Sequence, residues 1–351
     1  MANYILKRLL LMIPTLIGVL LVTFLVTQFV PGGPVEQLIS QLEGSDANGG
    51  EVSLSSGGLY QGKKGLEAEH VEKLNELYGF DKPAYERFFE MMLKFATFDL
   101  GDSYFHNKSV LDLMLSKLPV SISLGVWSFL IIYLISIPLG IKKAVRDGTK
   151  FDVTTSTAIL VGYAIPGFIL GIALLVLFGG GSFFDVFPLK GLVSDNWDEL
   201  PWYLKITDYL WHMVLPITAS TIGGFATLTM LTKNSFLEEI RKQYVLTARA
   251  KGLDESTVLY HHVFRNAIIP VITGFPSAFI AAFFTGSLLI ETIFSLDGLG
   301  LLAYESILKR DYPVVLGSLF FFTILGLIAK LITDISYVLV DPRIQFDAVN
   351  K

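Results

Sequence analysis

Long apolar runs, separated by shorter polar stretches, dominate the hydrophobic pattern of the chain. A helix needs about 20 largely apolar residues to cross a hydrocarbon core about 30 Å thick. The first such run extends from Leu9 to Val30 without a charged residue. Five further runs of comparable length lie at residues 119–141, 154–178, 211–232, 268–294 and 314–340. We therefore predict an all-α polytopic membrane protein with about six transmembrane helices.

The first run is also compatible with a secretory signal peptide, because Lys7 and Arg8 precede it. However, it is longer than the apolar region of such a peptide, no small-residue cleavage site follows it, and further apolar runs come later. We therefore expect residues 1–30 to be retained as the N-terminus and first transmembrane helix.

Prolines and charged residues lie within or beside these runs. Pro119 stands where a first helical turn tolerates proline. Asp334, near the end of the last run, weakens the prediction of a span there. Membrane helices accept internal proline when neighbouring groups satisfy the freed carbonyls, and we expect this at Pro138, Pro166, Pro216 and Pro276.

The charges between the runs predict the orientation of the spans. Residues 142–153 and 233–267 are rich in lysine and arginine, whereas residues 179–210 carry two lysines against five acids. Short loops rich in Lys and Arg stay in the cytoplasm. We therefore expect both basic loops and the N-terminus to be cytoplasmic, and six spans then place the tail, residues 341–351, on the same side.

Residues 31–118 are consequently expected outside the membrane. They contain 14 acids and 8 bases, and the stretch from Gly44 to Gly65 is rich in glycine and serine, as flexible loops are. From Leu66 to Lys117 apolar residues recur at helical spacing, which predicts a small external helical insertion. This insertion is too short to bury a good core alone, so it should lean on the five-helix core, residues 119–340.

The cytoplasmic segment 233–270 has the most informative polar pattern. Ser235 and Glu238 match a capping box, which predicts a helix from there to the residue before Gly252. Gly252 suits the left-handed end of a helix, and Asp254 can cap a second helix. The segment therefore predicts a compact knob of two short helices that meet at a glycine.

Ala248 and Gly252 lie four residues apart, so we expect one side of this knob to be nearly bare backbone that a partner can approach closely. The alternative is an amphipathic connector between two spans, and the pattern alone leaves both interpretations open.

Few residues suggest enzyme chemistry. The absence of cysteine excludes disulfides and thiolate metal sites. His261 and His262 are adjacent and diverge on a helix, which makes a poor metal pair. Residues 57–64 nearly spell a phosphate-binding loop, but Lys64 stands where Ser or Thr would hold Mg²⁺. We therefore expect no catalytic site, no metal site and no ATPase in this chain.

The composition agrees with the membrane prediction. Hydrophobic residues make up 52% of the chain and charged residues 17%, with a mean hydropathy of +0.57. The net charge of −5 argues against a nucleic-acid binder, which needs a basic surface.

Two runs, 211–232 and 268–294, contain many small and hydroxyl-bearing residues. Such faces either pack helices closely or line a watery path, and the sequence leaves both roles open. Glu291 is a carboxylate near the outer end of a predicted span, where it is costly unless it faces water or a partner. We consider two roles for it: lining an outer gate, or holding the loop 295–313 in place.

Motifs that follow one another along the chain indicate a family. The segment Tyr244-Val245-Leu246-Thr247-Ala248-Arg249-Ala250-Lys251-Gly252-Leu253 precedes His262-Val263-Phe264-Arg265-Asn266-Ala267-Ile268-Ile269-Pro270. Together they resemble the "EAA" coupling loop of permeases from the oligopeptide/dipeptide/nickel group of ABC importers. Leu246 in place of the generic glutamate, and a late Pro270, are typical of the peptide-permease branch.

The resemblance covers nearly the whole chain. Asp297 departs from it, because proline is usual there. The run Thr232-Lys233-Asn234-Ser235-Phe236 and the long outer insertion look most like the Yej-type peptide and microcin C permeases. The other matching motifs are Arg8-Leu9-Leu10, Val30-Pro31-Gly32-Gly33-Pro34, Leu77-Tyr78-Gly79-Phe80, Asp99-Leu100-Gly101-Asp102-Ser103, Leu118-Pro119, Glu291-Thr292-Ile293-Phe294-Ser295, Arg310-Asp311-Tyr312-Pro313 and Asp341-Pro342-Arg343-Ile344.

The resemblance implies a permease of the type I ABC importer fold in a bacterial inner membrane. It implies three protein partners: a cytoplasmic ATPase that binds ATP and Mg²⁺, a second homologous permease, and an external substrate-binding protein. Phe294, Arg310 and Asp311 join Glu291 as candidates for the outer gate. The knob is expected to dock in a groove of the ATPase, with contacts from Thr247, Ala248, Arg249, Lys251 and Gly252.

An ion- or proton-coupled secondary carrier is the alternative function. It would need ionisable residues within the membrane and repeat symmetry. The sequence has only Glu291 and Asp334 near span ends and no obvious repeat. The resemblance implies oligopeptides or peptide-like compounds as the cargo and leaves the particular compound open. Nickel transport also occurs in the family, but no His/Asp cluster near the outer gate supports it here.

Overall fold

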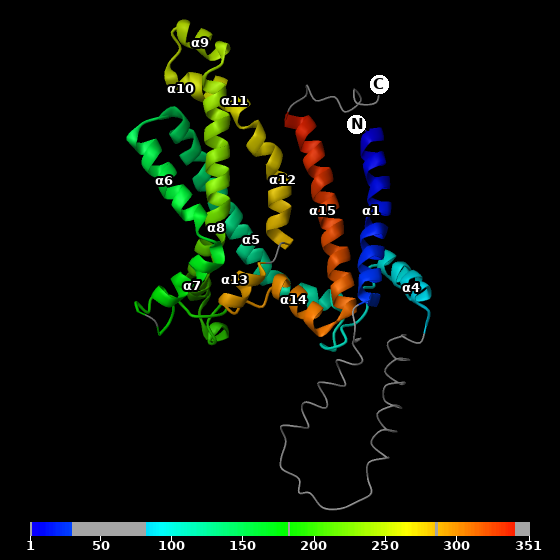
Figure 1. The fold of residues 1–351 in the computed structure, drawn as a ribbon. Helices are drawn as coiled ribbons and strands as arrows, with labels where there is room; N and C mark the ends of the chain where they lie inside the picture. The colour runs from blue at the N-terminus through cyan, green and yellow to red at the C-terminus, as the bar shows by residue number, and fades with distance from the viewer. Residues whose placement is uncertain (1, 30–81, 182, 285–286, 341–351) are drawn as a thin grey trace, which may run out of the picture. The chain divides into compact units, whose positions relative to one another are not determined.

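The computed structural model describes residues 2–29, 82–181, 183–284 and 287–340. Within these ranges the chain is helical, apart from loops and two isolated extended bridges, Asp102 with Ser109 and Gly179 with Phe187. The predicted all-α class is confirmed. Figure 1 shows the helices, which belong to two compact units that we describe separately.

Four helices are long and apolar enough to cross a membrane: α1 (Ala2–Phe29), α5 (Val110–Val145), α8 (Trp202–Ile240) and α15 (Tyr312–Val340). Two bent pairs pass the same test, namely α6 (Lys150–Ala164) with α7 (Gly167–Phe178), and residues 255–267 with α12 (Ile269–Phe284). Counting each bent pair as one span gives the predicted six in the described part of the chain.

The span expected at 154–178 is not one continuous helix. α6 ends before Ile165, and α7 begins after Pro166 at an angle of 92° to it. Proline lacks an N–H and disfavours the helical conformation of the residue before it. Ile165 is accordingly extended, with φ −87° and ψ 118°. The expectation that this span would absorb Pro166 was wrong, whereas Pro138, Pro216 and Pro276 do lie inside helices.

Two other boundaries differ from the expected ones. α5 begins at Val110, so Pro119 lies inside this helix instead of in its first turn. The run expected at 268–294 contains two helices, α12 and the short α13 (Leu288–Ile293), which carries Glu291. The apolar composition continues through residues 268–294, but a single helix does not. Hydropathy alone carries no information on where a helix ends, so this division was not predicted.

One unit comprises Met1–Arg8, Lys117–Leu302 and Leu325–Lys351. Here α6 and α7 both pack against α8. One hydrophobic cluster lies where α5 and α8 meet residues 243–271, and it includes Ala144, Phe236 and Val263. A second cluster lies where α5, α8 and α13 meet, and it includes Leu124, Met213 and Ile290. These two clusters position the two ends of α8.

Asp334 has partners in this unit. Arg8 Nη2 lies 3.0 Å from its Oδ2, and the Tyr4 hydroxyl donates to the same oxygen over 3.1 Å. The charge that weakened the prediction of the last span is thus neutralised by the start of the first helix. A carboxylate with an arginine partner is far less costly in an apolar setting than an isolated one.

The other unit comprises Leu9–Ser116 and Ala303–Ile324, with α4 (Ala84–Ala96) and most of α14 (Leu299–Lys309). The helical spacing seen after Leu66 is confirmed in α4. The buried side chains of this unit come from α1, α4, the loop after α4, the start of α5 and the start of α15, and include Leu20, Phe24, Phe95, Leu100, Val110, Val314 and Phe320.

Several expectations lie outside the described residues. They concern the Gly/Ser-rich stretch 44–65, the near phosphate-binding loop at 57–64, the first part of the helical insertion, and the tail 341–351. The domain boundaries 1–30, 31–118, 119–340 and 341–351 therefore stay predictions.

Candidate functional site

The predicted knob consists of residues 243–267 and stands at the end of α8 (Figure 1). Its first helix is α9 (Gln243–Ala250). After the glycine turn, α10 (Glu255–Thr257), a π-helical turn (Val258–Val263) and α11 (Phe264–Ala267) form one continuous second arm. The two-helix arrangement expected from the sequence is therefore present.

The start of the first arm was predicted wrongly. α8 continues through Ser235 and Glu238 to Ile240, and α9 begins only at Gln243. A capping box acts where the chain enters a helix from a non-helical residue. Because the residues before Ser235 are already helical, the end amides that the box would satisfy have partners within α8.

The turn at Gly252 is a helix stop with two backbone hydrogen bonds. Gly252 has φ +78°, its N–H donates to the carbonyl of Arg249 over 2.9 Å, and the N–H of Leu253 donates to Ala248 over 3.4 Å. This pairing is the Schellman motif, which favours glycine because other residues are strained in the left-handed region. The predicted role of Gly252 as a helix end is confirmed.

The second arm is capped as predicted, and an ion pair bridges the turn. Asp254 Oδ2 accepts from the N–H of Ser256 over 3.0 Å. Arg249 reaches Glu255 with two parallel bonds, Nε to Oε1 at 2.8 Å and Nη2 to Oε2 at 3.0 Å. Both side chains are exposed, so the pair stabilises the turn only weakly, but its fork geometry holds the two arms in one orientation.

The knob has its own hydrophobic interior. Val245 and Ala248 from α9 face Val258 and Val263 from the second arm, and Phe236 of α8 closes the cluster from below. Ala248 is buried. Its small side chain therefore lets the two arms approach each other, and the expectation that Ala248 forms a bare outer face was wrong.

The tyrosine of α9 joins the knob to α8. The Tyr244 hydroxyl donates to Glu239 over 2.7 Å and accepts from Asn266 Nδ2 over 3.2 Å. Burial raises the pKa of Tyr244, so the phenol stays protonated and can donate at neutral pH. Lys242 binds the other oxygen of Glu239. One carboxylate thus connects α8, α9 and the second arm.

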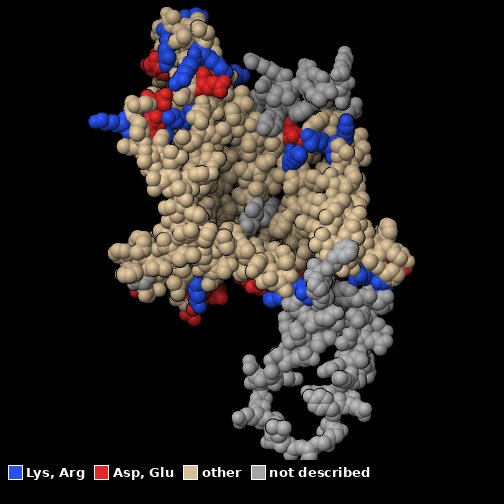
Figure 2. Space-filling model, viewed as in Figure 1, with Lys and Arg blue, Asp and Glu red and all other residues tan. Residues whose placement is uncertain are grey.

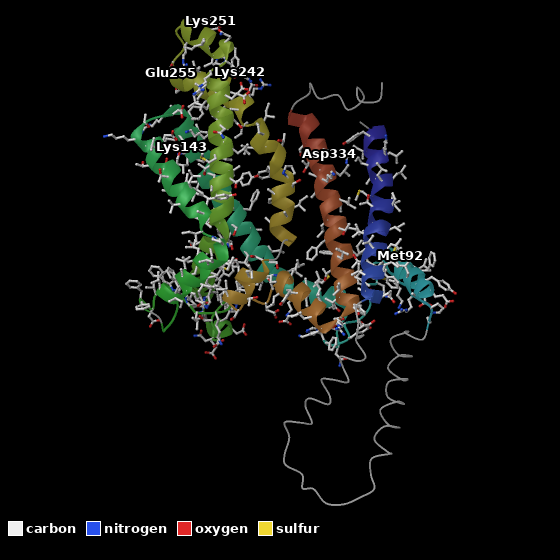
Figure 3. All side chains as sticks on the ribbon, viewed as in Figure 1. Met92, Lys143, Lys242, Lys251, Glu255 and Asp334 are labelled. Carbon is white, nitrogen blue, oxygen red and sulfur yellow. The ribbon has the colours of Figure 1, made fainter. Side chains whose placement is uncertain are left out.

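The outer surface of the knob carries the remaining predicted contacts. Thr247, Arg249, Lys251 and Gly252 are all exposed, and Figure 3 shows Lys251 at the far end of the knob. Apolar side chains are exposed among them, which the sequence analysis did not single out: Leu246 (48%), Leu253 (40%) and Tyr260 (59%). Exposed apolar groups rimmed by charge are typical of protein-binding surfaces.

An ion cluster at the root of the knob was also missed. Asp152 at the start of α6 lies 3.1 Å from Lys143 of α5 and 2.7 Å from Lys233 of α8. Lys233 also pairs with Asp147, which in turn contacts Arg241. The sequence showed these residues as a mixed-charge loop, because the pairing depends on three helices meeting. Figure 2 shows both signs of charge gathered at this end of the unit, beside largely uncharged surface.

Glu291 does not point toward an open path within its unit. The side chain is fully buried, and its two oxygens accept from the N–H groups of Ser287 (3.0 Å) and Leu301 (2.7 Å). Gly298 leaves the room that this carboxylate occupies, since a Cβ there would lie 2.5 Å from its Cδ. Of the two roles considered, the geometry supports the one in which Glu291 holds the following loop in place.

The other candidates for an outer gate are likewise part of the packing, each within its own unit. Phe294 is 2% exposed and belongs to the cluster with Met213. Asp311 is fully buried, accepts from the Ser103 hydroxyl over 2.5 Å and from the Tyr104 N–H over 3.2 Å. Arg310 has φ +59°. Phe294 and Asp311 are thus both enclosed by other residues of their own units.

The spans rich in small residues approach their neighbours closely. A Cβ on Gly125 of α5 would lie 1.4 Å from the carbonyl oxygen of Ala282 in α12, so no other residue fits there. Beside this contact, α5, α8 and α12 line a largely apolar cavity of about 490 Å³, with residues that include Ser128, Gly224, Thr227 and Ala281. Small residues at helix contacts are typical of membrane bundles.

Metal chemistry finds no support in the described ranges. No group of three or more His, Asp or Glu side chains comes together among residues 2–29, 82–181, 183–284 and 287–340. His261 is exposed and His262 half-buried on the second arm of the knob.

Known proteins resemble this chain over nearly its full length. The model of the family described as "Binding-protein-dependent transport system inner membrane component" matches residues 136–346. The chain is 59% identical over 360 residues to the peptidoglycan transport system permease protein YejB of Agrobacterium fabrum, with 99% of both chains covered. It is 56% identical over 362 residues to the inner membrane ABC transporter permease protein YejB of Escherichia coli O157:H7, covering 99% of this chain and 100% of that one. It is 31% identical over 347 residues to the oligopeptide transport system permease protein AppB of Bacillus subtilis, covering 99% of this chain and 100% of that one.

Proposed function

The chain belongs to the family of binding-protein-dependent transport system inner membrane components, and on that premise we propose that its cargo is oligopeptides or peptide-like compounds. The resemblance to ABC importer permeases is confirmed. The chain is a permease subunit and not an enzyme, and a separate subunit hydrolyses ATP. The peptide assignment is supported by the permeases of oligopeptide and dipeptide systems to which the chain is 31% identical.

We propose that the knob transmits the movement of the ATPase to the membrane helices. A transmitting element must move as a rigid body. The knob fits this requirement because its turn is closed by the Gly252 hydrogen bonds, its interior is filled, and Glu239 ties it to α8. Thr247, Arg249, Lys251 and Gly252, with the apolar Leu246, Leu253 and Tyr260, form the surface offered to the ATPase.

The proposed coupling requires the knob to lie in the cytoplasm, and six spans would then place both chain termini on the same side. The basic loops 142–153 and 233–267 support this orientation through the positive-inside rule. Both loops belong to the same end of one unit, since Asp147 and Asp152 pair with Lys233 and Arg241. The insertion 31–118 would then face the outside, where a substrate-binding protein delivers its cargo.

A second, homologous permease is the remaining proposed partner. The apolar cavity between α5, α8 and α12 supports this partner, because small residues such as Gly224 and Thr227 leave space there. Helices of another subunit can fill this space, or the two subunits together can enclose it as a path for the cargo. The secondary-carrier alternative has no comparable support, since family membership assigns the energy source to a partner ATPase.

The experiment that tests the coupling is a pair of tryptophan substitutions. Gly252→Trp places a large side chain on the docking surface, and Gly148→Trp is its control. Both glycines have positive φ (+78° and +75°), and a Cβ at either meets no atom within 4 Å. The two variants therefore suffer the same backbone strain, of about 1–2 kcal/mol, without a clash inside the protein.

We expect Gly252→Trp to insert and assemble normally but to lose ATP-driven, vanadate-sensitive peptide uptake in proteoliposomes. Gly148→Trp should retain most of the uptake. Undiminished uptake by an inserted Gly252→Trp complex would refute the docking role of the knob. Equal loss in both variants would mean that strain, and not docking, explains the effect.

A further inference from the structure

Helix α4 carries an exposed apolar stripe. Tyr85, Phe89 and Leu93 follow one another at four-residue spacing, so they lie on one face of the helix. Their exposed fractions are 63%, 64% and 73%. Contiguous exposed apolar surface on a folded protein marks a contact with lipid or with another protein.

A neighbouring face of α4 is already occupied by its own unit. Phe88 packs on Phe24 of α1, with ring centroids 5.3 Å apart, and Phe95 packs on Phe320 of α15 at 5.0 Å. Arg87 donates to the side-chain oxygen of Gln28 over 2.6 Å. These contacts fix which face of α4 points outward, and the stripe is that outward face.

The contacts also fix the depth of α4 relative to the first span. Gln28 is the last residue of the apolar segment Tyr4–Gln28, so α4 is attached where α1 leaves the hydrocarbon core. Figure 1 shows α4 running crosswise beside this end of α1. A helix that lies across the end of a span lies in the plane of the membrane surface.

The surface beside α4 is lipid-facing. Just 11% of the apolar window of α1 is buried, and Val22 and Val26, close to Gln28, are both more than half exposed. In a protein of the inner membrane such a surface contacts acyl chains. The stripe of α4 is thus an extension of a lipid contact that the first span already makes.

The composition of α4 fits the same environment. Aromatic and leucine side chains in one stripe, flanked by charges such as Glu86, Glu90 and Lys94, are typical of helices that lie at the boundary of headgroups and acyl chains. Tyrosine is favoured at this depth because its ring is apolar and its hydroxyl remains hydrated.

We propose that α4 is an interfacial helix, whose Tyr85, Phe89 and Leu93 enter the outer boundary of the bilayer next to α1. The occupant of the stripe is lipid. The helix thereby anchors the C-terminal part of the insertion to the membrane surface. This anchoring does not depend on which compound the importer carries.

Site-directed spin labelling tests this inference in the assembled importer. The chain contains no cysteine, so single cysteines can be introduced without removing native ones. Phe89→Cys and Leu93→Cys report on the stripe, Val22→Cys is the lipid-facing control on α1, and Glu90→Cys is the control on an exposed polar position of α4. The labelled complexes are placed in vesicles of phosphatidylethanolamine and phosphatidylglycerol, and uptake shows that each is folded.

Accessibility to oxygen, which concentrates in lipid, is compared with accessibility to a water-soluble nickel chelate. We expect labels at Phe89 and Leu93 to match Val22, with oxygen favoured severalfold over the chelate, and Glu90 to show the reverse. Labels on the stripe that match Glu90 would overturn the inference, because the stripe would face water. Labels shielded from both reagents, with or without added substrate-binding protein, would overturn it as well, because protein would cover the stripe.

Discussion

Replacing Asp152 with asparagine should weaken the attachment of α6 to α5 and α8. Figure 3 labels its partner Lys143, whose side chain is fully buried. The Asp152 side chain is 6% exposed and lies between Lys143 at 3.1 Å and Lys233 at 2.7 Å. Asp152→Asn removes the counter-charge of a buried ammonium group. Breaking a buried ion pair on one side costs about 3–5 kcal/mol.

The hydrogen bonds that Lys143 keeps place the expected loss at the lower end of this range. Its ammonium group also donates to the main-chain oxygen of residue 152 (2.9 Å), to Thr155 (2.8 Å) and to Ser156 (2.7 Å). We therefore expect a loss of about 3 kcal/mol. For a chain of this size, that corresponds to an unfolding midpoint lower by roughly 4 °C.

Thermal unfolding of the purified complex in lipid nanodiscs measures this shift. Asp147→Asn is the matched control, because Asp147 also pairs with Lys233 but is 34% exposed. A partly exposed pair contributes about 0–1 kcal/mol, so the midpoint of the control should fall by at most about 1 °C. Asp152→Leu combined with Lys143→Met should recover most of the loss, since it removes both charges of this pair while Lys233 keeps Asp147 as a partner. Equal midpoints for Asp152→Asn and Asp147→Asn would refute the reasoning.

Three further substitutions test the packing. Gly125→Ala should abolish assembly or cut it severely, because its Cβ would lie 1.4 Å from the carbonyl oxygen of Ala282; assembly equal to that of the unchanged protein, measured by size-exclusion chromatography, would contradict the close approach of α5 and α12. Glu291→Gln should lower stability by about 1–3 kcal/mol, because one of two buried N–H groups loses its acceptor; reduced uptake at unchanged stability would instead restore Glu291 to a gate. Arg8→Leu should lower the amount of inserted protein by leaving Asp334 without its cation, and adding Asp334→Leu should restore it; if the double variant is no better than Arg8→Leu, the pair is not the cause.

The sequence alone determined the class of protein, the regions that span the membrane, and the position of the knob. Lipid offers no partner for backbone polar groups, so spans must be helical, long and apolar, and this requirement is visible in any window of the chain. The turn at Gly252 and the cap at Asp254 were predictable for a similar reason. Both depend on residues within four positions of each other.

The tertiary structure decided what the individual charged and aromatic side chains do. Asp152 and Lys233 are 81 residues apart in sequence, and Ser103 and Asp311 are 208 apart. A local pattern carries no information on such pairs. Phe294 and Asp311 were therefore candidates for a gate, and the role of Glu291 stayed open, although each is buried in its unit. The same limit applies to Ala248. Its spacing from Gly252 was visible in the sequence, but the arm that covers it comes from residues 255–267.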